Sequence, residues 1–184
     1  HFLYAVWTPL CAVALSLLSQ SLFNPDIAPG WLEIWIFCST FFVYHFTHHL
    51  PAMRWTAWAM GVLAGICFFY LPNEVQLFTP LPAVAWLGYF WSLRGHPIAK
   101  PLLVASVWLL VTHFMVLPWP MAVMSWPVAV ARFGLVFALA LGYDLLDRLY
   151  DQRLDTATLA LVLGGRNIFL VSALALGIAA LALL

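Results

Sequence analysis

Four aspartates spaced three and four residues apart form the part of this sequence best suited to chemistry. They lie in a twelve-residue stretch that holds six of the chain's fourteen charged residues: Asp144, Asp147, Arg148, Asp151, Arg153 and Asp155. On an α-helix, at about 100° per residue, the four carboxylates fall within an arc of about 80°. Carboxylates at these spacings repel one another. A divalent cation would offset the repulsion, and Mg²⁺ is typically held by one or two carboxylates together with substrate phosphates.

The acidic run therefore predicts a site at which Mg²⁺ joins a helix face to a diphosphate. Arg148 lies near the same face and could contact a phosphate directly. The simpler alternative is that these charges only mark a solvated loop or anchor a helix end at a membrane interface. The sequence around the run is almost free of charge, which favours the metal–diphosphate interpretation.

The composition indicates the setting in which this run must work. Hydrophobic residues make up 65% of the 184 residues and charged residues 8%, whereas about a quarter of a soluble domain is charged. This excludes an ordinary cytosolic enzyme, a disordered tail and a secreted disulfide domain. The seven basic and seven acidic residues balance, so there is no basic field to attract nucleic acid. The three cysteines lie inside apolar runs and are interpreted as core residues rather than bridges or ligands.

Seven apolar segments come close to the roughly 20 residues that a membrane span needs. They cover residues 2–23, 31–46, 55–71, 78–93, 102–117, 127–143 and 167–184. Tryptophans near their ends resemble an interfacial aromatic belt, namely Trp31, Trp55, Trp91, Trp119 and Trp126. We therefore expect an all-α polytopic membrane protein whose residues 1–184 form a single transmembrane helical domain.

Basic residues collect in alternate connections between these segments, which fixes an orientation. They lie between the second and third segments, between the fourth and fifth, and after the sixth. Because positive residues favour the cytoplasmic side, the aspartate run is expected there, in a multi-pass protein of the bacterial inner membrane. Arg132 is the exception, since it lies within the sixth segment, where a charge usually faces a partner or a wet cavity.

The run Asp144-x-x-Asp147-x-x-x-Asp151, followed by the TLALVLG stretch of residues 158–164, resembles the second aspartate-rich motif of the UbiA superfamily. Its members are intramembrane prenyltransferases, usually with nine spans. The resemblance implies a UbiA-like bundle with about seven of those spans present, in a chain truncated at both ends. It also implies Mg²⁺ as cofactor, a prenyl diphosphate as donor and a lipophilic acceptor, for example an aromatic one.

The same resemblance assigns roles to individual residues. Asp144, Asp147 and Asp151 would hold the metal and serve catalysis, with Asp155 as a supporting metal ligand. Basic side chains would contact the diphosphate oxygens; these are Arg148, Arg94 and Lys100, the last two from the connection where the family often carries basic residues.

The position of the family's first aspartate motif, near residues 45–53, contains no carboxylate. It holds His45, His48 and His49, which share one helical face at i, i+3, i+4 spacing. They could be interfacial histidines without a ligand, contacts to a diphosphate or acceptor hydroxyl, or transition-metal ligands. The missing carboxylates also motivate a second hypothesis: a non-catalytic UbiA-like protein that binds an isoprenoid or quinone lipid, or a partner subunit.

Overall fold

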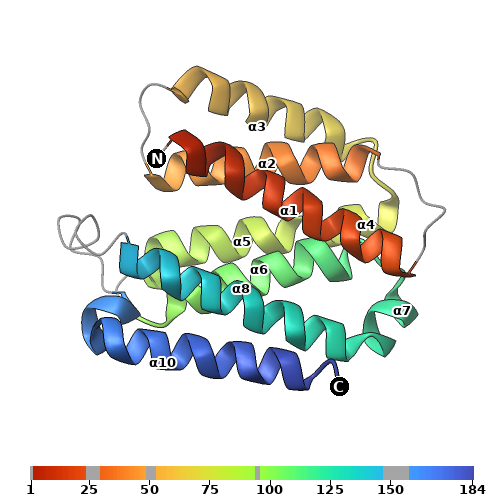
Figure 1. The fold of residues 1–184 in the computed structure, drawn as a ribbon. Coiled ribbons are helices and arrows are strands. Elements are labelled where there is room, and N and C mark those ends of the chain that lie inside the picture. The colour runs from red at the N-terminus through yellow and green to blue at the C-terminus, as the bar shows by residue number, and fades with distance from the viewer. Residues whose placement is uncertain (1, 24–29, 49–52, 94–95, 147–157) are drawn as a thin grey trace. The chain divides into compact units, whose positions relative to one another are not determined.

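The computed structural model describes residues 2–23, 30–48, 53–93, 96–146 and 158–184 (Figure 1). Within these ranges the chain forms helices and short connections and no strand, which confirms an all-α fold. Three helices are long and apolar enough to cross a membrane: Val6–Phe23 within α1 (Phe2–Phe23), α8 (Trp126–Leu146) and α10 (Leu159–Leu181). These helices indicate a membrane protein.

Contacts within the chain group its residues into two compact units. The first unit comprises residues up to Thr79 together with Val111–Pro118. The second comprises Pro80–Leu110 and Trp119–Leu184. A single domain over residues 1–184 remains a prediction, and each unit is described by itself.

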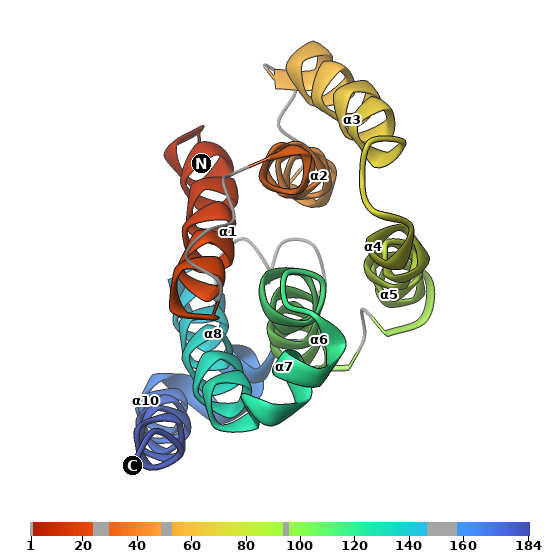
Figure 2. The ribbon, with the colours of Figure 1, turned by 90° about the vertical axis from the view of Figure 1, so that its right-hand side faces the viewer.

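In the first unit, α2 lies between α1 and α3 and contacts both (Figure 2). Its helices are α1, α2 (Trp31–His48), α3 (Arg54–Phe68), α4 (Asn73–Phe78) and, from Val111 on, the π-helical segment η3 (Leu110–Phe114). Helices α2 and α3 approach closely at Gly61, where a Cβ would lie 2.6 Å from the Phe42 ring. Trp58 extends this contact, with its ring edge-on to that of Phe46 at 5.4 Å.

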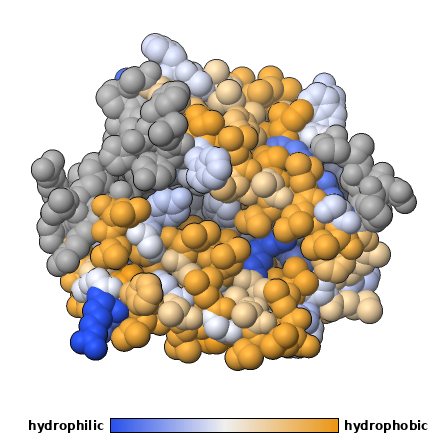
Figure 3. Space-filling model, viewed as in Figure 1, coloured by the Kyte–Doolittle hydropathy of each residue, from blue (hydrophilic) through white to orange (hydrophobic). Residues whose placement is uncertain are grey.

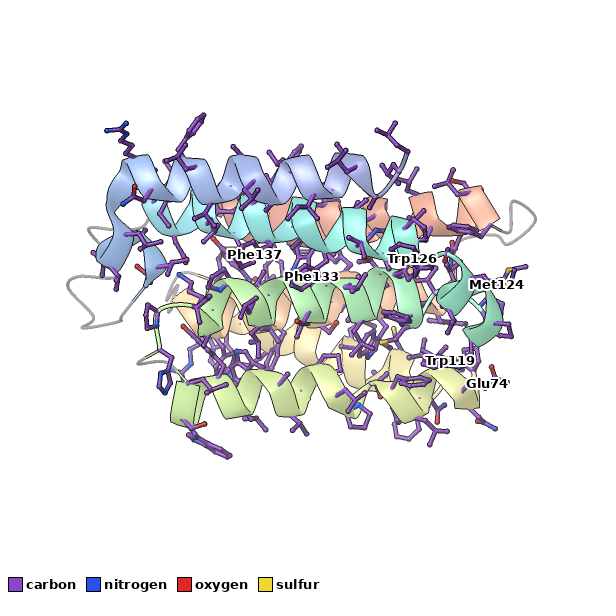
Figure 4. The ribbon with its side chains drawn as sticks, turned by 90° about the horizontal axis from the view of Figure 1, so that it is seen from below. Glu74, Trp119, Met124, Trp126, Phe133 and Phe137 are labelled. Atoms are coloured by element: carbon purple, nitrogen blue, oxygen red, sulfur yellow. The ribbon has the colours of Figure 1, made fainter. Side chains whose placement is uncertain are left out.

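In the second unit, α8 packs against both α10 and α6. The helices are α5 (Pro80–Gly88), the π-helical segment η2 (Tyr89–Leu93), α6 (Ala99–Leu109), α7 (Trp119–Met124), α8 and α10. At Gly134 a Cβ would lie 2.8 Å from the Ala175 carbonyl oxygen, so α8 and α10 need a residue without a side chain there. One turn apart on α8, Phe133 and Phe137 stack with ring centroids at 6.1 Å (Figure 4).

Most helix bounds follow the predicted segments, but the short helices α4 and α7 were not predicted, and one larger difference lies near the C-terminus. The seventh segment was expected to begin at Asn167, after the charged Arg166, but α10 begins at Leu159. The backbone at Gly164 is non-helical, with φ at 75°, so the helix continues through a kink that glycine tolerates. Arg166 is exposed on this helix, so its charge did not mark a helix end.

The surface is apolar to a degree that suits lipid contact. Apolar residues cover most of the face seen in Figure 3, and only 11% of the apolar window of α10 is buried. The tryptophans predicted to lie near span ends are all exposed: Trp31, Trp55, Trp91, Trp119 and Trp126. Exposed apolar surface of this extent marks a membrane or protein contact, in agreement with the transmembrane interpretation.

Candidate functional site

Two of the predicted site residues meet in the second unit as an ion pair. Lys100 Nζ lies 2.7 Å from Asp144 Oδ1. Asp144 belongs to the last turn of α8 and Lys100 to the first turn of α6. The Asp144 side chain is 2% exposed, and that of Lys100 is 20% exposed. A predicted metal carboxylate and a predicted phosphate-binding cation are therefore held together at one helix end.

This pairing explains how a carboxylate can be buried at the end of an apolar helix. Burial of an ionised carboxylate costs roughly several kcal/mol in lost hydration, and a nearby positive charge can compensate for this cost. Lys100 supplies that charge, and the exposed part of its side chain leaves it within reach of solvent. The arrangement places a negative group inside the helix packing and a positive group at its edge.

The rest of the predicted site lies outside the described residues, apart from two histidines. The residues outside are Asp147, Asp151, Asp155, Arg148, Arg94 and His49. Within the part of the chain that the structure describes, no three His, Cys, Asp or Glu residues gather closely enough to hold a metal ion. The aspartate cluster therefore remains a prediction that rests on its spacing.

Thr158, the first residue of the TLALVLG stretch, is fully buried and directly precedes the first turn of α10. The residues after it form the start of α10 as far as the kink at Gly164. The nearby apolar core joins Leu141 of α8 to Ala160 and Ile168 of α10. This packing ties the TLALVLG stretch to the helix that carries Asp144.

The two histidines of the predicted site that the structure describes, His45 and His48, belong to the first unit. His45 is buried on α2, and its ring stands edge-on to that of Phe46 at 6.2 Å. His48 is the last residue of α2. A buried ring among aromatic side chains fits the helix packing better than an open phosphate site. The alternatives for the three histidines, with or without a ligand, are not decided by these positions.

The first unit also contains a buried polar cluster that the sequence analysis did not single out. Glu33 of α2 is buried, and its carboxylate accepts hydrogen bonds from three neutral groups. Ser16 Oγ and Gln20 Nε2 donate to Oε1 at 3.2 and 2.7 Å, and the Gly30 backbone N–H donates to Oε2 at 2.7 Å. A polar stripe on an otherwise apolar helix, formed by Ser16, Ser19 and Gln20 at i, i+3, i+4 spacing, was the available signal.

Next to this stripe, Ser19 connects α1 to the π-helical segment η3. Its hydroxyl donates to the Thr112 carbonyl oxygen at 2.7 Å. Segments of π-helix widen the backbone and often occur at functional sites. The neighbouring His113 is fully buried, with its ring edge-on to Phe23 at 6.5 Å. The first unit therefore contains buried polar side chains from α1, α2 and η3 among mostly apolar residues.

Two smaller predictions concern residues inside apolar segments. Arg132 is buried within α8, in agreement with an inward-facing charge. All three cysteines are free, with Cys38 and Cys67 buried and Cys11 partly buried.

No protein-family model, curated protein or solved structure matches the chain. The described residues form an all-α fold, and its three long apolar helices indicate a membrane protein. The resemblance to the UbiA superfamily rests on the motif residues alone, and the function is argued from the site.

Proposed function

We propose that this protein is a UbiA-like intramembrane prenyltransferase. It would transfer a prenyl group from a Mg²⁺-bound prenyl diphosphate to a lipophilic acceptor, in a multi-pass bundle of the bacterial inner membrane whose aspartate motif faces the cytoplasm. One observation carries the proposal: the 2.7 Å contact between Lys100 and Asp144. It brings a cation suited to phosphate beside the first carboxylate of an aspartate run suited to Mg²⁺.

The donor set fits Mg²⁺ because the predicted ligands, Asp144, Asp147 and Asp151 with Asp155 in support, are all carboxylates, which this hard cation prefers. When bound, Mg²⁺ would supply positive charge to the diphosphate leaving group. In this proposal Lys100, Arg148 and Arg94 bind phosphate oxygens through charge-assisted hydrogen bonds. The bond between the prenyl carbon and the diphosphate oxygen breaks, the diphosphate leaves with the electron pair, and the acceptor bonds to the prenyl carbon and loses a proton.

The apolar helices suit the other half of such a substrate. A prenyl chain requires an apolar environment, and α8 and α10 are two of the three described helices that are long and apolar enough to cross a membrane. Excluding water from an allylic cation prevents its hydrolysis. Asp144 stands in the last turn of one of these helices, so a charged headgroup site and an apolar wall would be continuous along α8.

A second candidate function is favoured by a different observation. No carboxylate occurs between Tyr44 and Met53, and His45 in that region is buried beside Phe46. A protein that lacks half of the usual metal cradle would bind an isoprenoid or quinone lipid, or a partner subunit, without transferring a prenyl group. Lys100 would then neutralise Asp144 permanently.

Binding of a labelled prenyl diphosphate to the full chain in lipid nanodiscs, with and without Mg²⁺, tests the proposed site. Asp147→Asn and Asp151→Asn should each lose most of the Mg²⁺-dependent binding, because each removes a negative metal ligand. Glu74→Gln is the matched control, since Glu74 is exposed in α4 and lies outside the aspartate run (Figure 4). Unchanged binding in both aspartate variants would refute the site.

Release of diphosphate separates the two candidate functions. Mg²⁺-dependent release in the presence of a lipophilic acceptor would eliminate the non-catalytic alternative. Saturable binding without release, across aromatic and aliphatic acceptors, would eliminate the transferase.

A further inference from the structure

The Glu33 carboxylate differs from Asp144 in how its charge is balanced. Its side chain is 6% exposed, and its three hydrogen-bond donors are a hydroxyl, an amide and a backbone N–H, all of them neutral. Within the described part of the chain Glu33 takes part in no ion pair. Desolvation of a buried carboxylate is offset by hydrogen bonds and, more fully, by a positive charge; here the described residues supply neutral donors and the N-terminus of α2, which leaves room for a bound cation.

A buried hydrogen-bond acceptor without a partner lies beside the Glu33 carboxylate. Gln20 is 6% exposed, and its Oε1 has no hydrogen-bond partner among the described residues. Its Nε2 is bonded to Glu33 Oε1 at 2.7 Å, so the unpartnered oxygen belongs to an amide already anchored beside the carboxylate. A buried acceptor without a partner is destabilising in its own right.

A single bound cation would balance the charge of Glu33 and give Gln20 Oε1 a partner. It would neutralise the carboxylate and accept electron density from the Gln20 carbonyl oxygen and the Ser16 hydroxyl. All of these ligand atoms are oxygens, which suit hard cations rather than the softer transition metals. One carboxylate supplies one negative charge, which matches a monovalent ion and leaves a divalent ion only half neutralised.

We propose that Glu33, Gln20 and Ser16 form a binding site for a single Na⁺ between α1 and α2. The site is preorganised from both helices. The Glu33 side chain reaches back to Gly30, just before α2, and accepts a hydrogen bond from its backbone N–H, as in a capping box. Ser16 and Gln20, one turn apart on α1, direct their polar ends to the same oxygen. The proposal does not depend on the prenyltransferase function.

Binding of radioactive ²²Na⁺ to the full chain in nanodiscs tests the site, with choline chloride holding the ionic strength constant. Saturable binding of one Na⁺ per chain is expected, displaced by unlabelled Na⁺ and not by choline. Glu33→Gln should abolish it, because the variant removes the charge while nearly preserving the shape. The exposed Glu74→Gln serves as control and should bind as the unmodified chain does.

Two further variants keep the test valid if Glu33→Gln does not fold. Gln20→Met keeps the side-chain volume and removes the carbonyl oxygen, and Ser16→Ala removes the hydroxyl. Each should weaken Na⁺ binding about tenfold or more while circular dichroism and gel filtration stay unchanged. The absence of saturable ²²Na⁺ binding to the unmodified chain would overturn the proposal. Saturable ²²Na⁺ binding that is unchanged in all three variants, Glu33→Gln, Gln20→Met and Ser16→Ala, would overturn it as well.

Discussion

The two units of this protein each bury a carboxylate, and they balance its charge in different ways. In the second unit Asp144 is paired with Lys100 at 2.7 Å. In the first unit Glu33 is surrounded by the neutral donors of Ser16, Gln20 and Gly30. Burial alone therefore does not define the chemistry of an acidic group in an apolar helix. The compensating charge does, and only Asp144 has one within the described residues.

The helix positions of these groups sharpen the contrast. Glu33 stands in the first turn of α2, where the helix dipole favours a negative charge. Asp144 stands in the last turn of α8 and Lys100 in the first turn of α6, so each lies at the end that its charge disfavours. Residues that break a local rule are expected at functional sites. This favours the pair, rather than either residue alone, as part of a ligand site.

The largest effect is expected from removing the cation of the pair. Lys100→Met leaves Asp144 charged, buried and at the unfavourable end of α8, which should lower the free energy of unfolding by about 3–5 kcal/mol. Unfolding in mixed micelles, or steric trapping in bicelles, measures this. Lys100→Arg keeps the charge and is the control, with a smaller expected loss.

The double variant Lys100→Met/Asp144→Leu completes the test of the pair. Replacing a buried ion pair by apolar side chains is often neutral, so most of the stability should return. A double variant as unstable as the single one would show that packing, and not uncompensated charge, explains the loss. The coupling energy from the full mutant cycle gives the strength of the interaction.

A smaller effect is expected at Glu33, the buried carboxylate that has no ion pair with a described side chain. Glu33→Leu leaves the hydroxyl of Ser16, the amide of Gln20 and the N–H of Gly30 without their acceptor, and should cost about 2–3 kcal/mol. The exposed Glu74→Leu should change stability by less than about 0.5 kcal/mol. A loss at Glu33 larger than that of Lys100→Met would mean that its neutral donors contribute more than the ion pair.

The sequence predicted most of the helices because the signals for them are strong, and it singled out Asp144 as a candidate site residue. Long apolar runs bounded by proline and charge define α1, α2 and α8, and an aspartate run in an almost uncharged chain stands out. Lys100 was also assigned to the site, although its direct partner, Asp144, was not predicted. Types and positions of charged residues are visible in a sequence, whereas their pairing depends on how helices pack.

Glu33 escaped prediction for a physical reason. Helices that are apolar all round carry no contrast between a lipid face and a packed face, so the direction of one glutamate could not be read from its neighbours. The π-helical segments η2 and η3 and the kink at Gly164 also depend on packing rather than composition. Only the Ser16, Ser19 and Gln20 stripe carried information about the buried side.

A further prediction concerns the packing that holds α8, and with it Asp144, in place. Gly134→Val would bring a side chain against the Ala175 carbonyl oxygen and against Ala179, where even a Cβ would lie at 2.8 and 3.0 Å. The two helices would have to move apart, at about 1–2 kcal/mol. Gly142→Ala is the control, because a Cβ at Gly142 would meet no atom within 4 Å and the helix should tolerate it. Equal losses in both variants would contradict close packing at Gly134.

The smallest expected effect lies beside the Glu33 cluster. Ser19→Ala removes the hydrogen bond from Ser19 Oγ to the Thr112 carbonyl oxygen, which holds α1 against η3. Such bonds between membrane helices contribute about 0.6 kcal/mol on average, so a loss of that size is expected in the same unfolding assay. Ser21→Ala is the matched control, since Ser21 is exposed and bonds only within its own helix, to Leu18. A loss at Ser19 close to that of Glu33→Leu would show that the hydroxyl stripe of α1 acts as one cooperative network, and the contrast between charged and neutral compensation would then have to include η3.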